Sequence, residues 1–159
     1  MFTAAQPTQQ QAPHEAYAVI AAVFIGGLAS VAALSRRSPP GTALELAALS
    51  AATFKVSRTL TRERIGSFVR QPFVDGDANV GEDERPAGTG LQRAVGELVT
   101  CPRCLGTWSA AALASSQVIS PRFGRLLTWT LGASAANDFL QAAFSALCAK
   151  TNQLEDEAR

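Results

Sequence analysis

The chain has 159 residues, of which 47% are hydrophobic and 17% charged, and its formal net charge is +1. This length suits one compact unit and leaves no room for a classical two-domain enzyme. A net charge so close to zero creates no overall field that would attract nucleic acid or an acidic substrate, so we expect no nucleic-acid partner. The single histidine, His14, excludes a histidine-rich metal site and a catalytic triad with a central histidine.

Residues 1–15 are polar and rich in glutamine, so we expect a disordered tail. Residues 16–34 follow as nineteen residues without a charge. At about 1.5 Å per residue, a helix of this length spans the hydrocarbon core of roughly 30 Å, which predicts a transmembrane helix. Small residues at every fourth position form a candidate helix-packing face, although an alanine-rich composition produces such ladders equally well: Ala18, Ala22, Gly26 and Ser30.

A second apolar segment, residues 43–60, is more polar because it carries Glu45 near one end and Lys55 and Arg58 near the other. Long basic side chains reach the membrane surface from within a helix, so this segment is either a second span or an interfacial helix. As a span, it forms a helical hairpin with the first segment over residues 16–60.

Residues 61–100 form the one sizeable polar region, which we interpret as a cytoplasmic loop with amphipathic segments next to the membrane. Residues 75–90 are acidic and contain glycine and proline, which is typical of a flexible linker. Residues 91–100 place apolar side chains at helical spacing, which predicts a short amphipathic helix on the membrane or on the bundle. Three arginines near the start of the loop are interleaved with apolar residues and are expected to contact lipid phosphates: Arg62, Arg64 and Arg70.

Two further apolar segments, residues 105–119 and 126–148, predict a second hairpin within residues 101–149, followed by a polar tail over residues 150–159. The predicted fold class is all-α, a multi-pass membrane bundle of about four transmembrane helices in two hairpins. The positive-inside rule states that the cytoplasmic loops of membrane proteins carry an excess of lysine and arginine. With four spans, this rule places the long loop and both termini in the cytoplasm, although three spans with an external N-terminus fit the charge count slightly better.

Three stretches together resemble a bacterial family of small membrane proteins, the domain-of-unknown-function family numbered 1360. They are ATFKVSRTLTRERIGSFVRQPF at residues 52–73, GELVTCPRCLGTW at residues 96–108 and ASAANDFLQ at residues 133–141. The resemblance covers about residues 43–148. It implies a multi-pass protein of the inner membrane in which the second segment also spans. Some members are labelled sporulation-related, and no activity is implied.

The sharpest local motif is Cys101-Pro102-Arg103-Cys104, at the entry to the third apolar segment. Thiols at a helix N-terminus, beside an arginine, favour the thiolate, which suits redox or metal chemistry. Zinc requires four ligands, so a metal would be shared between two protomers. The plainer interpretation is a capped helix entry with two unreactive thiols. We expect no stable disulfide, because the cytoplasm is reducing.

Asn137 and Asp138 lie near the middle of the last apolar segment. Asp138 is either a proton or cation site or, as we favour, polar glue bonded to a neighbouring helix. The partners expected for this bond are Gln117, Ser115, Ser116 or Thr130.

No catalytic constellation is evident, so the first functional hypothesis is a non-enzymatic interaction or scaffold role in the cell envelope. The second is a thiol-redox or metal-binding membrane protein that uses Cys101 and Cys104. The third is a small transporter component. No cofactor is expected apart from the shared metal, and the expected partners are the lipid bilayer and a second copy or another membrane protein.

Overall fold

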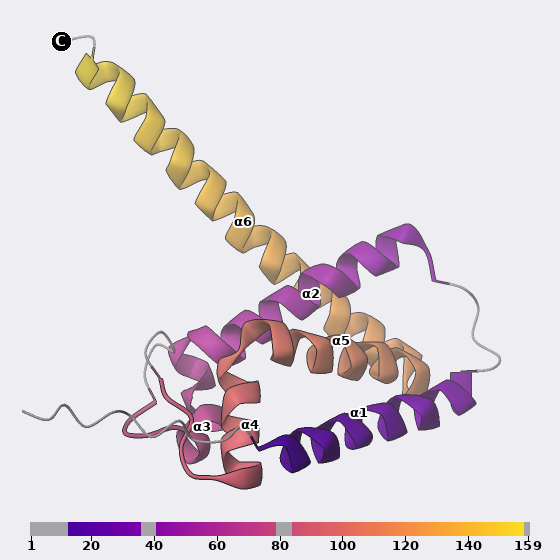
Figure 1. Ribbon diagram of the computed structural model, residues 1–159. Coiled ribbons are helices and arrows are strands. Elements are labelled where there is room, and N and C mark those ends of the chain that lie inside the picture. The colour runs from indigo at the N-terminus through magenta and orange to yellow at the C-terminus, as the bar shows by residue number, and fades with distance from the viewer. Residues whose placement is uncertain (1–12, 36–40, 79–83, 158–159) are drawn as a thin grey trace, which may run out of the picture.

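The computed structural model describes residues 13–35, 41–78 and 84–157, and all regular structure in these ranges is helical (Figure 1). The all-α class is therefore confirmed. The long helices are α1 (His14–Leu34), α2 (Ala43–Arg62), α4 (Gly90–Thr100), α5 (Pro102–Ile119) and α6 (Pro121–Glu157). Between α2 and α4 lie three short turns of helix, η2 (Arg64–Gly66), α3 (Ser67–Arg70) and η3 (Gln71–Phe73).

The start of α2 is defined by local sequence. Thr42 is its N-cap, and the Thr42 hydroxyl accepts a hydrogen bond of 3.2 Å from the Glu45 backbone N–H. The Glu45 carboxylate accepts one of 2.8 Å from the Thr42 backbone N–H. This reciprocal capping box satisfies two donors that the first turn of a helix otherwise leaves free.

Helix α2 is the centre of the fold and packs against both α5 and α6. Small residues permit this close approach: Ala52 is fully buried, and a Cβ added at Gly132 of α6 would lie 3.1 Å from the Ala48 carbonyl oxygen of α2. Helix α1 packs instead on α5 and α4, on the other side of α5 from α2 (Figure 1). Residues 16–60 thus form two helices that do not pack against each other as a hairpin. Helix α1 packs on α5 and α4, whereas α2 packs on α5 and α6.

Helices α5 and α6 pack against each other across a tight turn. Ser120 alone separates α5 from α6, and Gln117 donates a hydrogen bond of 2.9 Å to the Thr128 hydroxyl across the two helices. A Cβ at Gly124 would lie 2.5 Å from the Gln117 backbone nitrogen, so only glycine allows the helices to meet this closely at the turn.

Arg70 does not face the membrane surface, which corrects its predicted contact with lipid phosphates. Its side chain is fully buried, and its Nε and Nη2 atoms bond the Glu84 carboxylate at 2.6 and 3.0 Å. Its Nη1 atom donates to the carbonyl oxygens of Leu60, at 2.6 Å, and Glu63, at 3.2 Å. A buried guanidinium needs such partners to offset its desolvation, and here it ties the polar segment to the end of α2. Of the other two arginines, Arg64 is exposed and Arg62 half-buried.

The predicted flexible linker, residues 75–90, is held near both ends by backbone hydrogen bonds. Val74 and Pro86 form an isolated antiparallel bridge. The Asp75 backbone N–H donates to the Arg85 carbonyl at 2.9 Å, and that of Ala87 donates to the Phe73 carbonyl at 2.8 Å. The middle of the linker, residues 79–83, lies outside the described residues. The amphipathic helix predicted next is α4, which buries Ala94 and Val99.

Both termini are more helical than predicted within the described ranges. His14 and Glu15, which we assigned to the tail, form the first turn of α1, and residues 1–12 lie outside the description. At the other end, α6 continues without interruption to Glu157, so the polar tail is helical there. A helix that is already nucleated extends by one hydrogen bond per residue, and the polar residues of this tail include good helix formers.

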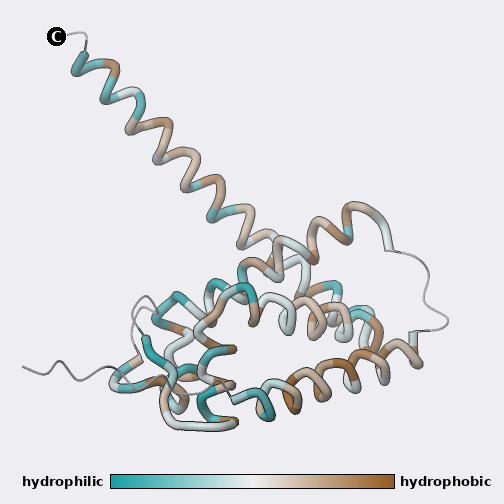
Figure 2. Tube along the Cα trace, in the orientation of Figure 1, coloured by the Kyte–Doolittle hydropathy of each residue, from teal (hydrophilic) through white to brown (hydrophobic). Residues whose placement is uncertain are grey.

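Among the described helices, α1 is the one long and apolar enough to cross a membrane (Figure 2). The other three predicted spans form helices, but each is too polar to meet the same criterion. The buried apolar core is small and rich in alanine, whereas many large apolar side chains are exposed, among them Val23, Ile25, Leu140, Phe144 and Leu147. A chain with this distribution has more apolar surface than its own core covers.

Candidate functional site: a thiol pair beside an aromatic groove

The two cysteines of the motif meet where α4 gives way to α5. Cys101 has extended backbone angles and is the N-cap of α5, and Pro102 occupies the first turn, where its missing N–H costs nothing. The Cys101 sulfur accepts a hydrogen bond of 3.3 Å from the Cys104 backbone N–H. The predicted capped helix entry is therefore present, with the sulfur in the place of the usual capping oxygen.

The Cys101 and Cys104 sulfurs lie 2.6 Å apart, and both cysteines are free thiols. The two thiols are therefore in direct contact at the entry to α5. In the described part of the chain, no group of three or more metal-ligating side chains gathers here or elsewhere.

The two thiols differ in acidity. Burial raises the pKa of Cys101, but hydrogen bonds from the Cys104 thiol and from the backbone of Cys104 and Arg103 outweigh it, so the pKa lies below its ordinary value. The Arg103 charge acts in the same direction. The hydrogen bond to Cys101 and burial raise the pKa of Cys104 to about 11. The pair therefore consists of a thiolate-prone sulfur and a neighbour that retains its proton, an asymmetry suited to nucleophilic sulfur chemistry.

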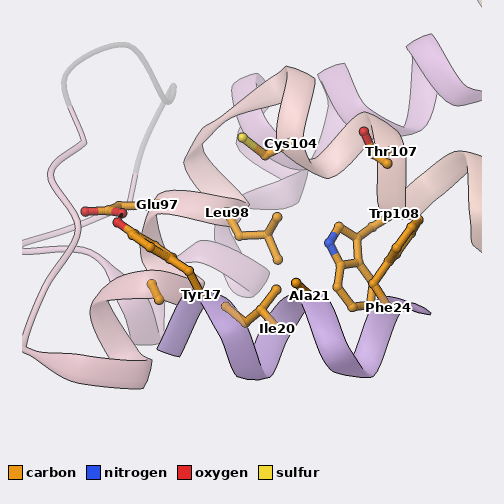
Figure 3. A pocket seen from close by; sticks show the side chains of 10 residues that line it. Tyr17, Ile20, Ala21, Phe24, Glu97, Leu98, Cys104, Thr107 and Trp108 are labelled. Carbon is orange, nitrogen blue, oxygen red and sulfur yellow. Dashed lines mark hydrogen bonds between the residues drawn. The ribbon is translucent and has the colours of Figure 1, made fainter. Parts of the chain in front are cut away.

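Cys104 also lines a groove of about 480 Å³ enclosed by α1, α4 and α5 (Figure 3). At one end, the rings of Trp108 and Phe24 meet edge to face with centroids 5.0 Å apart. At the other end, the Tyr17 hydroxyl donates a hydrogen bond to the Glu97 carboxylate. Apolar side chains from the two sides lie between these ends, namely Ile20, Ala21 and Leu98. The groove is thus lined by apolar side chains over most of its length and by Tyr17 and Glu97 at its polar end.

At the polar end of the groove, Glu97 also forms an ion pair with a residue one helical turn earlier. Arg93 Nε lies 3.1 Å from the Glu97 carboxylate, one helical turn away on α4. The part of the groove that α1 forms is harder to predict from the sequence than the ion pair on α4. Tyr17, the single tyrosine of the chain, stands at the start of an uncharged apolar run, and a tyrosine combines an apolar ring with a polar tip.

Asp138 has a partner that differs from those we expected. It accepts an ion pair of 2.8 Å from Lys55 of α2, whose Nζ also lies 3.3 Å from Glu63. Phe54 and Phe139 stack beside this pair with centroids 5.2 Å apart. Gln117, one expected partner, bonds Thr128 instead. The acid thus links α6 to α2, as polar glue would, while the neighbouring Asn137 is exposed.

The small-residue ladder on α1 faces away from the rest of the chain. Its four members are all exposed: Ala18, Ala22, Gly26 and Ser30. A Cβ added at Gly26 would meet nothing within 4 Å. The face of α1 that packs carries Ala16, Ile20 and Phe24. The predicted packing face is therefore not covered by any other described part of the chain, and its role stays a prediction.

Comparison with known proteins agrees with the resemblance noted in the sequence. Residues 48–144 match the model of the family described as "Protein of unknown function (DUF1360)". One similar protein is "Sporulation protein YjcA" of Bacillus subtilis (strain 168), which is 31% identical over 90 residues. These residues are 53% of this chain and 76% of that protein. No solved structure matches the chain.

Proposed function

Because the chain belongs to the DUF1360 family, whose members share no known function, we propose its function from its own geometry: a membrane protein whose Cys101 and Cys104 interconvert between dithiol and disulfide. The observation that carries this proposal is the 2.6 Å separation of the two sulfurs at the N-terminus of α5. A pair in a reducing cytoplasm forms such a bond transiently, as redox-sensing and catalytic pairs do.

The chemistry balances by thiol–disulfide exchange. The Cys101 thiolate attacks one sulfur of a disulfide on an oxidising partner, forms a mixed disulfide and releases one partner thiolate. Cys104 loses its proton to solvent, and its sulfur then attacks Cys101 and displaces the second partner thiolate. This chain gains one S–S bond, the partner takes up two electrons, and each released thiolate takes up a proton.

The test is a redox titration of the full-length protein, purified in detergent, with mixtures of reduced and oxidised glutathione. We expect an intramolecular Cys101–Cys104 disulfide that forms and breaks reversibly, detected by mass spectrometry after alkylation. Cys148, a lone and exposed thiol on α6, is the internal control and remains available to the alkylating reagent. If Cys101 and Cys104 remain dithiols across the titration, or form mixed disulfides only, the proposal is wrong.

The difference in acidity predicts a pH dependence. Because the pKa of Cys101 lies below its ordinary value, its alkylation by a maleimide should persist at a pH where an ordinary thiol has become slow. Cys104→Ala removes a hydrogen bond that stabilises the thiolate, so the pKa of Cys101 should rise and its alkylation at neutral pH should slow several-fold. An unchanged rate profile in this variant would show that Cys104 does not tune its neighbour.

The membrane setting that we propose is four spans in the inner membrane, with both termini in the cytoplasm. The start of α1, the polar segment with α4, and the end of α6 lie toward one side of the structure, and the α5–α6 turn lies at the other (Figure 1). Reporters fused at Pro40, Gly81 and the C-terminus test it. We expect the reporter at Pro40 outside and the reporters at Gly81 and the C-terminus inside. If all three lie inside, α2 does not cross the membrane.

A second candidate function is the interaction or scaffold role, favoured by the end of α6. Leu140, Phe144 and Leu147 are 70, 69 and 68% exposed on a helix that projects beyond α2 (Figure 1). A Cys101→Ser/Cys104→Ser variant that assembles into a complex of the same size as the wild type would favour this role. Loss of the complex would favour the thiol pair.

Three further expectations stay proposals beside these. A metal shared by the Cys101–Cys104 pairs of two protomers is one of them, and metal analysis of the purified protein tests it. Contacts of Arg62 and Arg64 with lipid phosphates predict binding to anionic vesicles that weakens with salt. The transporter hypothesis depends on Asp138 as a free acid, and its ion pair with Lys55 weakens that support.

A further inference from the structure

The groove beside the thiol pair is the feature of the molecule that the proposed function leaves unused. It has the volume and composition of a site for a small molecule, since such sites span about 300–1,000 Å³ and are mostly apolar with few polar groups. Its lining includes the Cys104 side chain, so an occupant would lie against one of the two paired thiols.

The walls of the groove restrict the shape and polarity of an occupant. Trp108 and Phe24 present aromatic faces and edges at one end, which suit a flat ring. Tyr17 and Glu97 make the other end polar; the Tyr17 hydroxyl, which donates to Glu97 in this structure, is the hydrogen-bond donor there that would have to turn to a ring oxygen of the occupant. An apolar wall between them excludes highly charged molecules, because burying an unpaired charge there is costly.

The position of the groove restricts the occupant further. One wall is the first half of α1, the described helix that is long and apolar enough to cross a membrane. A molecule that dissolves in the bilayer therefore reaches the groove along the same surface that anchors the protein. A water-soluble oxidant has no such route and would meet the thiols from the solvent side.

We infer that the groove binds the head group of a membrane quinone, which accepts the electrons of the Cys101–Cys104 pair. This inference rests on the proposed thiol function and puts a quinone in the place of the oxidising disulfide. A quinone is flat, apolar and lipid-soluble, and it accepts two electrons and two protons. In the reaction, an S–S bond forms between the two cysteines and the quinone becomes a quinol. One proton comes from the Cys104 thiol and the other from solvent, since Cys101 reacts as the thiolate.

The experiment uses the full-length protein in detergent and decylubiquinone, a short-chain quinone whose ring carbons all carry substituents, so that thiols do not add to the ring. Binding is followed by quenching of tryptophan fluorescence, and oxidation by loss of alkylatable Cys101 and Cys104. Quenching is also measured in Cys101→Ser, which leaves the lining of the groove unchanged and which we expect to bind the quinone without forming the disulfide.

A matched pair of variants on α1 identifies the site. Ala21→Phe fills the groove, whereas Ala22→Phe adds the same ring to a neighbouring exposed position that does not line it. We expect Ala21→Phe to weaken quinone binding and quinone-dependent oxidation by roughly tenfold or more, equivalent to about 1.4 kcal/mol. Ala22→Phe should resemble the wild type. Both variants should retain the glutathione-dependent disulfide, which shows that they fold.

The outcomes separate the two proposals. Reversible disulfide formation with glutathione, but no quinone binding, overturns the inference and leaves the proposed function intact. Quinone binding to a protein whose thiols never pair overturns the proposed function. Equal quinone-dependent oxidation in Ala21→Phe and Ala22→Phe would show that the quinone acts from outside the groove, and the inference would be wrong.

Discussion

Replacing Glu84 with alanine tests the ion pair that anchors the polar segment between α2 and α4. The Arg70 and Glu84 side chains are 0 and 7% exposed, and two hydrogen bonds join them. The substitution removes the Glu84 carboxylate from its two hydrogen bonds with a buried guanidinium. Arg70 retains its bonds to two backbone carbonyls, so the charge keeps part of its solvation by the protein.

Breaking a buried pair by removal of one partner costs about 3–5 kcal/mol. The two remaining carbonyl contacts favour the lower end of this range, about 3 kcal/mol. At about 1.4 kcal/mol per factor of ten, the segment around Arg70 would open on the order of a hundredfold more often. The increase should be local, since the contacts of α2 with α5 and α6 are not touched.

The assay is limited proteolysis in detergent at low protease concentration, where the rate of cleavage follows the population of the open state. Cleavage between residues 63 and 90 is mapped by mass spectrometry. Asp77→Ala is the matched control, because it removes the same charge from an exposed position in the same segment. Arg70→Met/Glu84→Leu should recover much of the resistance, because an apolar pair leaves no buried charge. If Glu84→Ala and Asp77→Ala are cut at equal rates, the pair does not anchor the segment.

Three further predictions address packing and the membrane. Gly124→Ala should destabilise the protein by about 1–3 kcal/mol in thermal unfolding, because its Cβ meets the facing backbone at 2.5 Å, whereas Gly26→Ala should be tolerated. A double-mutant cycle with Lys55→Met and Asp138→Leu should give a coupling energy of about 0.5–1 kcal/mol, modest because both side chains are partly exposed, and a value of zero would contradict the ion pair. The protein should sediment with membranes and resist carbonate extraction, and recovery in the soluble fraction without detergent would refute membrane insertion.

Much of the local structure could be predicted from the sequence. The apolar periodicity of residues 91–100 corresponds to α4, and the short polar stretch after residue 119 corresponds to the tight α5–α6 turn. The Cys101 cap and the pairing of Arg93 with Glu97 were also accessible, because each joins residues within one helical turn. Such interactions depend on spacing along the chain, which the sequence displays directly.

The contacts that define the interior could not be predicted in the same way. Arg70 appeared to be one of several surface arginines, and its burial depends on Glu84, fourteen residues further along. Lys55 and Asp138 are separated by 83 residues and are charged positions in two different apolar segments. Nothing local marks these residues as partners, since a single sequence contains no record of which helices lie side by side.

By itself, therefore, the sequence determined the helical class, the approximate extent of the long helices and the capped helix entry at the Cys-Pro-Arg-Cys turn, because hydrogen bonds and caps within a helix join near neighbours. The tertiary structure alone decided that α1 packs on α5 and α4, away from α2, and so brought Tyr17 and Phe24 to the groove beside Cys104. The physical reason is that helix pairing is selected by the fit between surfaces. Here the small residues of α2 are already covered by α5 and α6, so α1 buries its aromatic face elsewhere.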